Sequence, residues 1–552
     1  MLCASALLFP GLGAAPLERA EIYFLDGARG MVERADWLVP YYRGEPFFDK
    51  PPLTYWLMAA SFQAFGFSAG AARLVPAFAT LGVLLSTLWL GCVLFDRRTA
   101  LTGTLVLATT GAFVGFGHVA MSDMLLALFS TLAVAIAARA VAGGAHPAWP
   151  VALSAALGLG FLTKGPIALL LPGLGLLWLT VRHRAALPRP RLLAALAGTV
   201  VFALLAGGWF VLVHRRLGWG PLEHFFLREN LQRFAASTYD AQLPFWFYVP
   251  TYLAEGAPWS LFFPLAAWHG WRRQGASGRF LVGWFALMLV PLSLSRGKID
   301  YYLLPFYPAA SLLVARLFAH APWQARERAW SRVVLVLGAL ALAGLPLVVG
   351  TMPAGWVPGP AVRAVWTGAL FAAAAACAFA AVRAEAWRTL ATLAASAALV
   401  VATLGGLVVP AFHRAQPQAA IVEDVARELR FRRDATVVAC GDPARVQRDL
   451  LFQVRVVLQE RCDLWGLASS ERPFLLLLGP SERRSLMGTE GVREIDRYPF
   501  LPATALSLEG VVTREQPSEM TLAANFGTDD PEAETKRKRD RKRALREDGT
   551  PE

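Results

Sequence analysis

The most restrictive feature of this sequence is a series of apolar runs between residues 73 and 410 that are long enough to cross a bilayer. With 56% hydrophobic and only 17% charged residues, the chain is not a set of soluble domains, a disordered chain, a disulfide-rich secreted scaffold or a soluble nucleic-acid binder. The sequence therefore predicts an all-α polytopic membrane protein with about 13 transmembrane helices. The expected spans are 1–15, 73–94, 100–118, 122–141, 148–163, 165–181, 191–213, 246–268, 279–295, 300–320, 330–350, 361–382 and 389–410.

Arginine clusters indicate how these spans are oriented. They occur in alternate loops, which the positive-inside rule places in the cytoplasm, and they account for much of the net charge of +13. The loops around Ser122, Lys164, Lys298 and 353–360 are poor in Arg and are expected outside, together with the N-terminal loop and the C-terminal domain. The inner clusters are Arg97 and Arg98; Arg182, Arg184, Arg189 and Arg191; Arg272, Arg273 and Arg279; Arg326, Arg328 and Arg332; and Arg383 and Arg388.

Three segments need a separate interpretation. Residues 51–67 are apolar, but counting them as a crossing would move every later Arg cluster outside, so we expect a re-entrant or interfacial helix there. The run 1–15 is short and has no positive start, so it is either a clipped first helix or a poor signal peptide, and we expect a helix clipped by a start codon assigned too late. Residues 215–245 form a second outer loop with a predicted helix lying on the membrane. Its apolar face would consist of Phe225, Phe226, Leu231 and Phe234.

The chain divides into three predicted parts. Residues 1–413 form the membrane domain, in which 16–72 is an outer, catalytic loop that includes the interfacial helix. Residues 414–525 alternate helical and strand-like patterns and are expected to form a small α/β periplasmic domain, with a helix at 419–430 and strands at 436–439, 455–458 and 474–478. Residues 526–552 are densely charged and are expected to be a disordered tail.

Lysine usage singles out three positions. Of 53 basic residues only six are Lys, and three of those lie in the tail. The other three stand at the outer ends of apolar segments, where a chain that otherwise uses Arg has kept a compact, strongly hydrated ammonium. Chance retention at the interface explains any one of them, but three together indicate a site. They are Lys50, Lys164 and Lys298.

Five short motifs occur in order on the predicted outer face. The first loop runs from Glu21 through Asp26, Arg29 and Met31 to Asp36-Trp37-Leu-Val-Pro40. This loop ends in the first motif, Asp49-Lys50-Pro51-Pro52-Leu53-Thr54-Tyr55-Trp56, and the other four motifs are Ser122-Asp123, Leu162-Thr163-Lys164-Gly165-Pro166, Pro258-Trp259-Ser260 and Ser293-Leu-Ser295-Arg-Gly-Lys298-Ile-Asp-Tyr301-Tyr302-Leu-Leu-Pro305.

Together these motifs resemble those of the GT-C membrane glycosyltransferases of the protein O-mannosyltransferase superfamily, and within it the bacterial aminoarabinose-transferase-like branch. The resemblance covers residues from about Glu18 to Pro308. It implies a GT-C fold and a reaction in which a sugar leaves a polyprenyl phosphate. It departs at one position, because the family often has Asp-Glu at the start of the first loop and this chain has Ala20-Glu21.

This departure leaves three candidates for the catalytic carboxylate, namely Glu21, Asp123 and Asp26. Transfer to a hydroxyl needs a carboxylate base, whereas an acceptor that is already an ionised phosphate needs little help. Each carboxylate has an ordinary alternative as a solvated loop anion or a helix cap, and for Asp123, just before Met124-Leu125-Leu126, an N-cap is a serious competitor.

A leaving lipid phosphate needs cations that hold it and stabilise its growing charge. Lys50, Lys164 and Lys298 are the candidates, with Arg233 in the second outer loop. Arg233 and its neighbour Arg228 have the alternative role of contacting anionic lipid. Supporting residues in the same motifs are Asp49, Arg29 and Tyr301.

Metal or cofactor chemistry has little support in the sequence. The eight His are scattered, no Cys-x-x-Cys pair occurs, and only single carboxylates could ligate a metal. We therefore expect no required cofactor and no set of metal ligands, although the sequence does not exclude a divalent metal. Cys3, Cys92 and Cys377 lie in apolar runs. Cys440 and Cys462 could form a disulfide in an oxidising compartment, although their spacing does not indicate it.

The predicted function is transfer of a sugar from an undecaprenyl-phosphate-type donor to a lipid, such as lipid A, or to a protein or other envelope acceptor. The expected partners are this donor, that acceptor and membrane lipid, with no nucleic acid. The enzyme is expected in the bacterial inner membrane with its site on the periplasmic side. One alternative is protein O-mannosyltransferase-like activity, and another is a polyprenyl-lipid flippase or transporter, which would need polar groups reachable from both sides.

Overall fold

The structure is a computed structural model that describes residues 2–15, 17–18, 20–143, 145–183, 189–235, 243–319, 323–350, 359–411, 418–432, 434–440, 457–459, 466–467, 470, 472–479, 483–485, 492–500 and 518–525. The chain divides into two compact units, Met1–His413 and Arg414–Glu552. The predicted tail and Cys462 lie outside the described residues.

The first unit is helical except for one two-stranded hairpin, in the residues that the structure describes. The two segments predicted as outer loops, which keep that name below, contribute α2 (Glu21–Arg34), β1 (Tyr41–Tyr42), β2 (Glu45–Pro46), α3 (Leu53–Phe65), α11 (Gly220–Glu223), η1 (His224–Gln232) and α12 (Arg233–Ala235). The remaining elements are α1 (Leu2–Leu8), α4 (Ala69–Leu94), α5 (Arg97–Ala108), α6 (Gly111–Phe116), α7 (Asp123–Val141), α8 (Trp149–Lys164), α9 (Ile167–His183), α10 (Leu192–Leu217), α13 (Tyr248–Glu255), η2 (Trp259–Phe262), α14 (Phe263–Arg273), α15 (Gly275–Leu294), η3 (Asp300–Phe306), α16 (Tyr307–Ala319), α17 (Ala325–Gly350), α18 (Pro360–Arg383), α19 (Ala386–Thr403) and η5 (Leu404–Val408).

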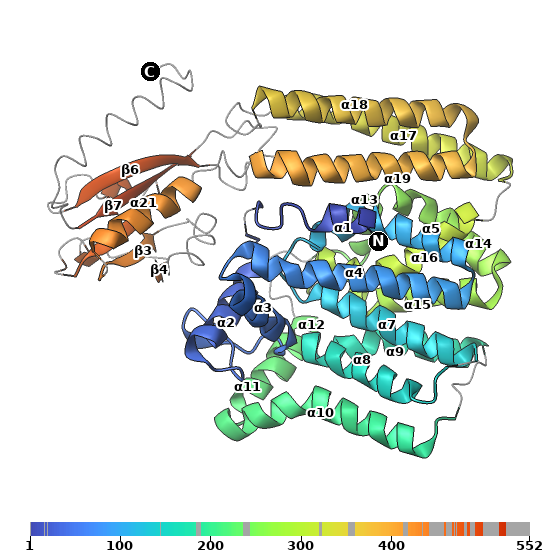
Figure 1. The fold of residues 1–552 in the computed structure, drawn as a ribbon, viewed down its shortest axis with the longest axis horizontal. Helices are drawn as coiled ribbons and strands as arrows, with labels where there is room; N and C mark the ends of the chain where they lie inside the picture. The colour runs from blue at the N-terminus through green and yellow to red at the C-terminus, as the bar shows by residue number, and fades with distance from the viewer. Residues whose placement is uncertain are drawn as a thin grey trace. The chain divides into compact units, whose positions relative to one another are not determined.

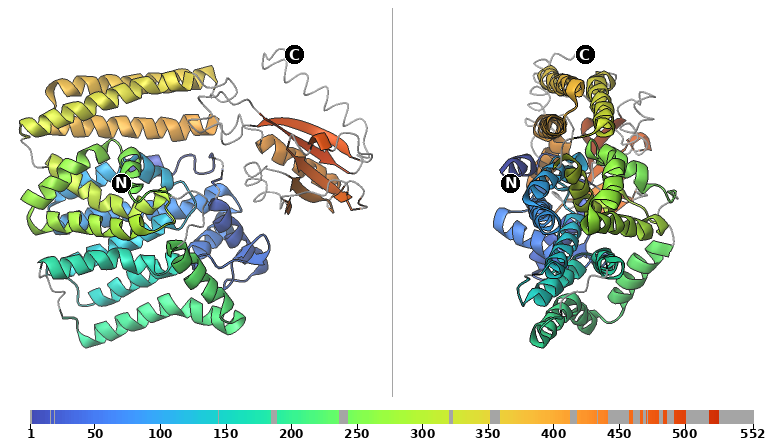
Figure 2. Two further views of the ribbon diagram at one scale, coloured as in Figure 1. Left: turned by 180° about the vertical axis from the view of Figure 1, so that it is seen from behind. Right: turned by 90° about the vertical axis from the view of Figure 1, so that its right-hand side faces the viewer.

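The apolar runs fold into long helices as predicted. Eight helices among the described residues are long and apolar enough to cross a membrane. Shorter helices occupy the other expected spans after residue 72, such as α8, α9 and the pair α5 and α6. These helices lie side by side, and the end-on view looks down most of their axes (Figures 1 and 2). The count of 13 crossings remains a prediction, and the first expected span contains only the short helix α1.

The outer elements gather at one end of this helical bundle (Figure 1). The predicted interfacial helix is α3, which packs with α2 and α4. A cluster of buried side chains joins the first outer loop to α8, α10 and η1 and so fixes the loop against the bundle. It contains Val39, Phe48, Leu162, Trp209, Phe210, Val213, Leu222 and Phe225.

The second outer loop differs from the predicted amphipathic α-helix. Its central part, η1, is a π-helix, in which the repeat is wider than in an α-helix. Phe225 is consequently buried in the cluster just described, while Leu231 and Phe234 are exposed. These side chains therefore do not form the single apolar face that α-helical spacing predicts.

The second unit is a small α/β domain. Its five-stranded sheet has the order β4-β3-β5-β7-β6, with β3 parallel to β4 and β5, and β7 antiparallel to β5 and β6. Ile421 and Val425 of α21 are buried against one face of the sheet (Figure 1). The elements are α21 (Gln418–Phe431), β3 (Thr436–Cys440), β4 (Val457–Gln459), β5 (Phe474–Leu478), β6 (Arg493–Phe500) and β7 (Ser518–Ala524).

Candidate functional site

Glu21, the first predicted carboxylate, lies at the start of α2 and is fully buried in an ion pair with Arg73 of α4. Arg73 Nε and Nη2 donate to the two carboxylate oxygens at 2.8 and 2.7 Å. The same oxygens accept from the backbone N–H groups of Ala120 and Glu18, both at 2.7 Å. Glu21 therefore joins α2, α4 and the segment before α7, and it lines neither of the two cavities described below.

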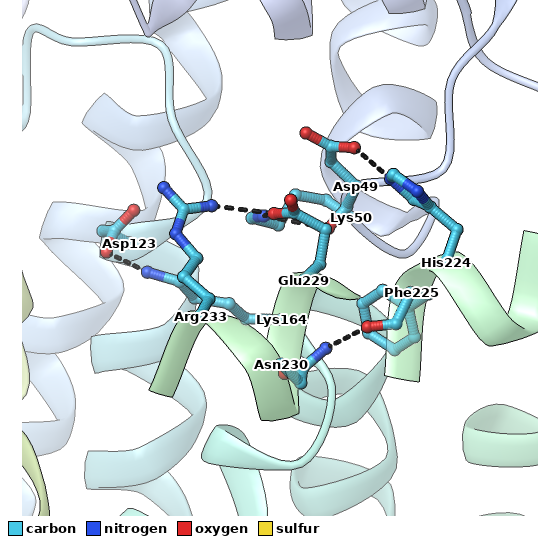
Figure 3. Close-up of polar contacts among 9 residues, drawn as sticks. All are labelled: Asp49, Lys50, Asp123, Lys164, His224, Phe225, Glu229, Asn230 and Arg233. Atoms are coloured by element: carbon cyan, nitrogen blue, oxygen red, sulfur yellow. Dashed lines mark hydrogen bonds and ion pairs between the residues drawn. The ribbon is translucent and has the colours of Figure 1, made fainter. Parts of the chain in front are cut away.

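Lys50 and Arg233 meet at a shared carboxylate (Figure 3). Lys50 ends the loop before α3, and its Nζ lies 3.2 Å from Oε2 of Glu229 in η1. Arg233 Nη1 donates to the same oxygen at 2.7 Å. Burial alone would raise the pKa of Glu229, but the charges of Lys50 and Arg233 outweigh burial and hold this pKa below its ordinary value. Two cations from separate outer loops are thus held together by one anion.

The π-helix explains why η1 can supply these groups. Residues five apart lie on the same side of a π-helix, so His224 and Glu229 both face the first outer loop. The side-chain amide of Asn230 donates to the backbone carbonyl of Phe225 at 2.7 Å (Figure 3). Phe225 in turn packs on Gly165, where a Cβ atom would lie 2.5 Å from the ring. The glycine that follows Lys164 thereby allows η1 to approach α8.

Asp123 and Lys164 form a second ion pair (Figure 3). Asp123 is the first residue of α7 and Lys164 the last of α8, and both side chains are nearly buried, with 5% and 10% exposed. Lys164 Nζ also lies 4.5 Å from the centroid of the Tyr302 ring, within range of a cation–π interaction. Ser122 occupies the N-cap position of α7, so the N-cap role considered for Asp123 is not the one that the structure shows.

The Lys50–Glu229–Arg233 cluster and the Asp123–Lys164 pair lie between two cavities. A largely apolar cavity of about 140 Å³ extends between α7, α9, α15 and η1, with walls that include Leu126, Ile167, Leu170 and Leu292. A more polar cavity of about 270 Å³ lies under the first outer loop. Both cavities are lined by Asp49, Lys50, Lys164, Glu229, Arg233 and Tyr302. The cations therefore form a wall between an apolar compartment and a polar one.

One group of side chains in this wall could ligate a metal. Ligand atoms of Asp49, His224 and Glu229 all lie within 4.8 Å of one another. His224 Nε2 is 2.8 Å from an oxygen of Asp49 (Figure 3). An imidazole and two carboxylates suit a divalent cation such as Zn²⁺. Glu229, however, is already ion-paired with Lys50 and Arg233.

The remaining predicted residues lie outside the shared wall. Asp26 accepts from the backbone N–H of Arg43 at 2.6 Å, and burial raises its pKa. Arg29 pairs with Glu33 along α2 at 2.7 Å. Lys298 donates to the carbonyl of Ser295 and lines neither of the two cavities, and burial lowers its pKa. Tyr301 lines the polar cavity.

Sequence reasoning missed Glu229 and His224. Glu229 lies 179 positions from Lys50, and His224 lies 175 positions from Asp49. No local spacing in the chain could have indicated either contact. The one usable signal was that His224 and Glu229 lie in the same loop as Arg233.

Comparisons with known proteins identify relatives of this chain. Residues 49–209 match the family model described as dolichyl-phosphate-mannose-protein mannosyltransferase. An undecaprenyl phosphate-alpha-4-amino-4-deoxy-L-arabinose arabinosyl transferase of Pectobacterium carotovorum subsp. carotovorum is 32% identical over 408 residues, which cover 71% of each chain. The protein of that name from Pectobacterium atrosepticum is 32% identical over 347 residues, which cover 60% of this chain and 61% of that relative's length.

Solved structures show the same fold. The crystal structure of ArnT from Cupriavidus metallidurans bound to undecaprenyl phosphate has a TM-score of 0.74 at 21% sequence identity and covers 95% of this chain and 97% of that chain. The apo structure of the same protein has a TM-score of 0.70 at 22% identity. Both likenesses extend over nearly the whole chain.

Proposed function

Because this chain belongs to the aminoarabinose-transferase family of GT-C membrane glycosyltransferases, we propose that it transfers a sugar from a polyprenyl phosphate donor to an envelope acceptor. The donor would be of the undecaprenyl phosphate type that the names of its relatives print. The acceptor would be a lipid of the lipid A type or another envelope molecule at the periplasmic face of the inner membrane.

The observation that carries this proposal is the wall of cations between the two cavities. A polyprenyl-phosphate sugar has an apolar chain, an anionic phosphate and a polar sugar, in that order. The apolar cavity suits the chain, the polar cavity suits the sugar, and Lys50, Lys164 and Arg233 stand where the phosphate would lie. All three cations are at one end of the bundle, which a transporter with access from both sides would not require.

The reaction that fits this arrangement is a direct displacement with inversion. The acceptor oxygen forms a bond to the anomeric carbon while the bond from that carbon to the phosphate oxygen breaks. The electron pair remains on the phosphate, whose charge changes from −1 in the donor to −2 in the product. Lys50 and Arg233 stabilise this added charge, and their interaction is stronger in the transition state than with the bound donor.

Asp123 is the carboxylate best placed to act as the base. It lines the polar cavity, whereas Glu21 and Asp26 do not. With a hydroxyl acceptor the proton passes to Asp123, and Lys164, released from its ion pair, can turn to the phosphate. With an ionised phosphate acceptor no proton needs to move, and Asp123 then positions Lys164.

The proposal is tested in a strain lacking the gene. Mass spectrometry of lipid A and envelope glycoproteins should show the loss of one sugar mass and the accumulation of its polyprenyl phosphate donor. Complementation with the wild-type chain should restore the modified product. An envelope that is identical with and without the gene would contradict the proposed function.

Lys50→Ala is expected to raise the donor KM about 10- to 100-fold, because a charge-assisted contact to phosphate is lost. Lys50→Arg should restore only part of this loss, because a planar guanidinium does not replace a compact ammonium. The assay is transfer by purified variants in nanodiscs. Lys298→Ala is the matched control, since Lys298 lines neither cavity, and its donor KM should stay near the wild-type value.

Reporter fusions should place Lys50, Lys164 and Lys298 outside the cytoplasm and Arg97 and Arg272 inside. The expectation follows from the alternating Arg-rich loops. Alkaline phosphatase and green fluorescent protein fusions after each position report the two sides. Finding Lys50 and Arg97 on the same side would contradict the periplasmic orientation.

A further inference from the structure

Two hydroxyl groups of residues that line the polar cavity have no hydrogen-bond partner among the described residues. They belong to Tyr55 of α3, whose side chain is fully buried, and Ser122, which is 1% exposed. Both residues line the polar cavity. Burying a hydroxyl without a partner costs free energy, so nearly all buried hydroxyls in proteins are paired. Two such groups in the walls of one cavity point to a ligand that pairs with them.

The Tyr55 ring is held firmly. It stacks on Phe24 of α2, with ring centroids 5.4 Å apart. It also packs on Gly27, where a Cβ atom would lie 2.6 Å from Cε1 of the ring. Burial, and then the nearby carboxylates Asp49 and Glu229, raise the pKa of Tyr55 well above its ordinary value, so the phenol remains a hydrogen-bond donor. Its hydroxyl group is thus fixed among the groups of the cation wall.

Ser122 stands at the N-cap position of α7 but does not cap this helix. Ser68 and Asp96 begin α4 and α5, and each side chain accepts a hydrogen bond from a backbone N–H in the first turn. Ser122 occupies the same position in α7, but its side chain makes no capping bond. Its hydroxyl group stands next to Asp123 and is not used to stabilise the helix.

We propose that Tyr55 and Ser122 form the sugar subsite, where their hydroxyl groups bind hydroxyl groups of the donor's sugar ring. Both can donate and accept, as a polyhydroxylated ring requires. Bound in this way, the ring would place its anomeric carbon between the phosphate at Lys50 and Arg233 and the acceptor at Asp123. Tyr55 and Ser122 are then specificity-determining residues of the reaction. This inference rests on the proposed function, since it names where the transferred group binds.

The test uses Tyr55→Phe and Ser122→Ala, which remove one hydroxyl each and keep the surrounding shape. Each should lower kcat/KM for the sugar-bearing donor about 10- to 100-fold. Affinity for undecaprenyl phosphate without a sugar should stay at the wild-type value. The thermal midpoint of the ligand-free protein should be equal or higher, because an unpaired buried hydroxyl has been removed.

The chain offers two matched controls. Thr54 and Ser130 also carry buried hydroxyls without a partner among the described residues, and neither residue lines the apolar or the polar cavity. Thr54 precedes Tyr55 in α3. Ser130 lies in α7, the helix whose N-cap position is occupied by Ser122. Thr54→Val and Ser130→Ala should leave kcat/KM near the wild-type value.

Wild-type kcat/KM in both Tyr55→Phe and Ser122→Ala would overturn the subsite. An equal loss of affinity for sugar-free undecaprenyl phosphate would also overturn it, since the residues would then act on the phosphate or on the fold. The proposed function fails separately if wild-type protein transfers no sugar. In that case binding still tests the subsite, because the wild-type chain should bind a sugar-bearing lipid more tightly than the sugar-free one, and Tyr55→Phe should reduce that difference.

Discussion

With a hydroxyl acceptor, Asp123→Asn is expected to lower the rate of sugar transfer by about 10²- to 10⁴-fold while donor affinity changes little. The amide keeps the shape of the carboxylate but cannot accept the acceptor's proton, and general-base catalysis contributes about this much to enzymatic rates. It also removes the charge that pairs with Lys164. Single-turnover transfer with purified protein and saturating donor measures the effect directly.

The matched control for this variant is Asp26→Asn. Asp26 was a sequence candidate for the same role, but it lines none of the described cavities. Its transfer rate should stay near that of the wild-type enzyme. Normal transfer by Asp123→Asn together with a large loss in Asp26→Asn would place the base on α2 instead.

Glu21→Gln is expected to destabilise the protein by about 3–5 kcal/mol, because it leaves the charge of Arg73 buried and unpaired. Arg73 also donates to the carbonyls of Leu12 and Ala15, so the loss extends to the N-terminal segment. The thermal midpoint in detergent should fall clearly, and the yield of folded protein should fall with it. Transfer per folded molecule should decrease far less than in Asp123→Asn.

Glu33→Gln is the control on the same helix. Glu33 pairs with Arg29 four residues away, and both side chains are partly exposed, so this ion pair contributes well below about 1 kcal/mol. Its thermal midpoint should be close to that of the wild-type chain. A Glu21→Gln protein of normal stability that transfers no sugar would instead make Glu21 the catalytic carboxylate.

The helical unit was predictable because hydropathy is a local property. The runs that became α4, α7 and α10 are apolar over most of their length, and no partner segment is needed to recognise them. In the second unit the apolar strands β3 and β5 were recognised, whereas β6 and β7 were not. β6 reads Arg-Glu-Ile-Asp-Arg-Tyr-Pro-Phe, and its pairing with β7 depends on contacts between distant segments.

The candidate site was predictable only as far as its cations. Counting Lys against Arg selected Lys50 and Lys164, which the structure places on the same cavity walls, but also Lys298, which it does not. The role of Glu21 as the partner of Arg73, 52 positions away, has no local signature. Nor does the π-helix of η1, whose wider repeat brings Glu229 to Lys50.

The most direct test of the proposed reaction is a transfer assay with purified protein in nanodiscs, supplied with an undecaprenyl-phosphate-linked sugar and a lipid A acceptor. The wild-type chain should yield sugar-modified acceptor and an equal amount of undecaprenyl phosphate. Asp123→Asn should yield strongly reduced product at unchanged donor binding. Wild-type protein that binds the donor but releases neither product, or an Asp123→Asn variant with wild-type turnover, would contradict it.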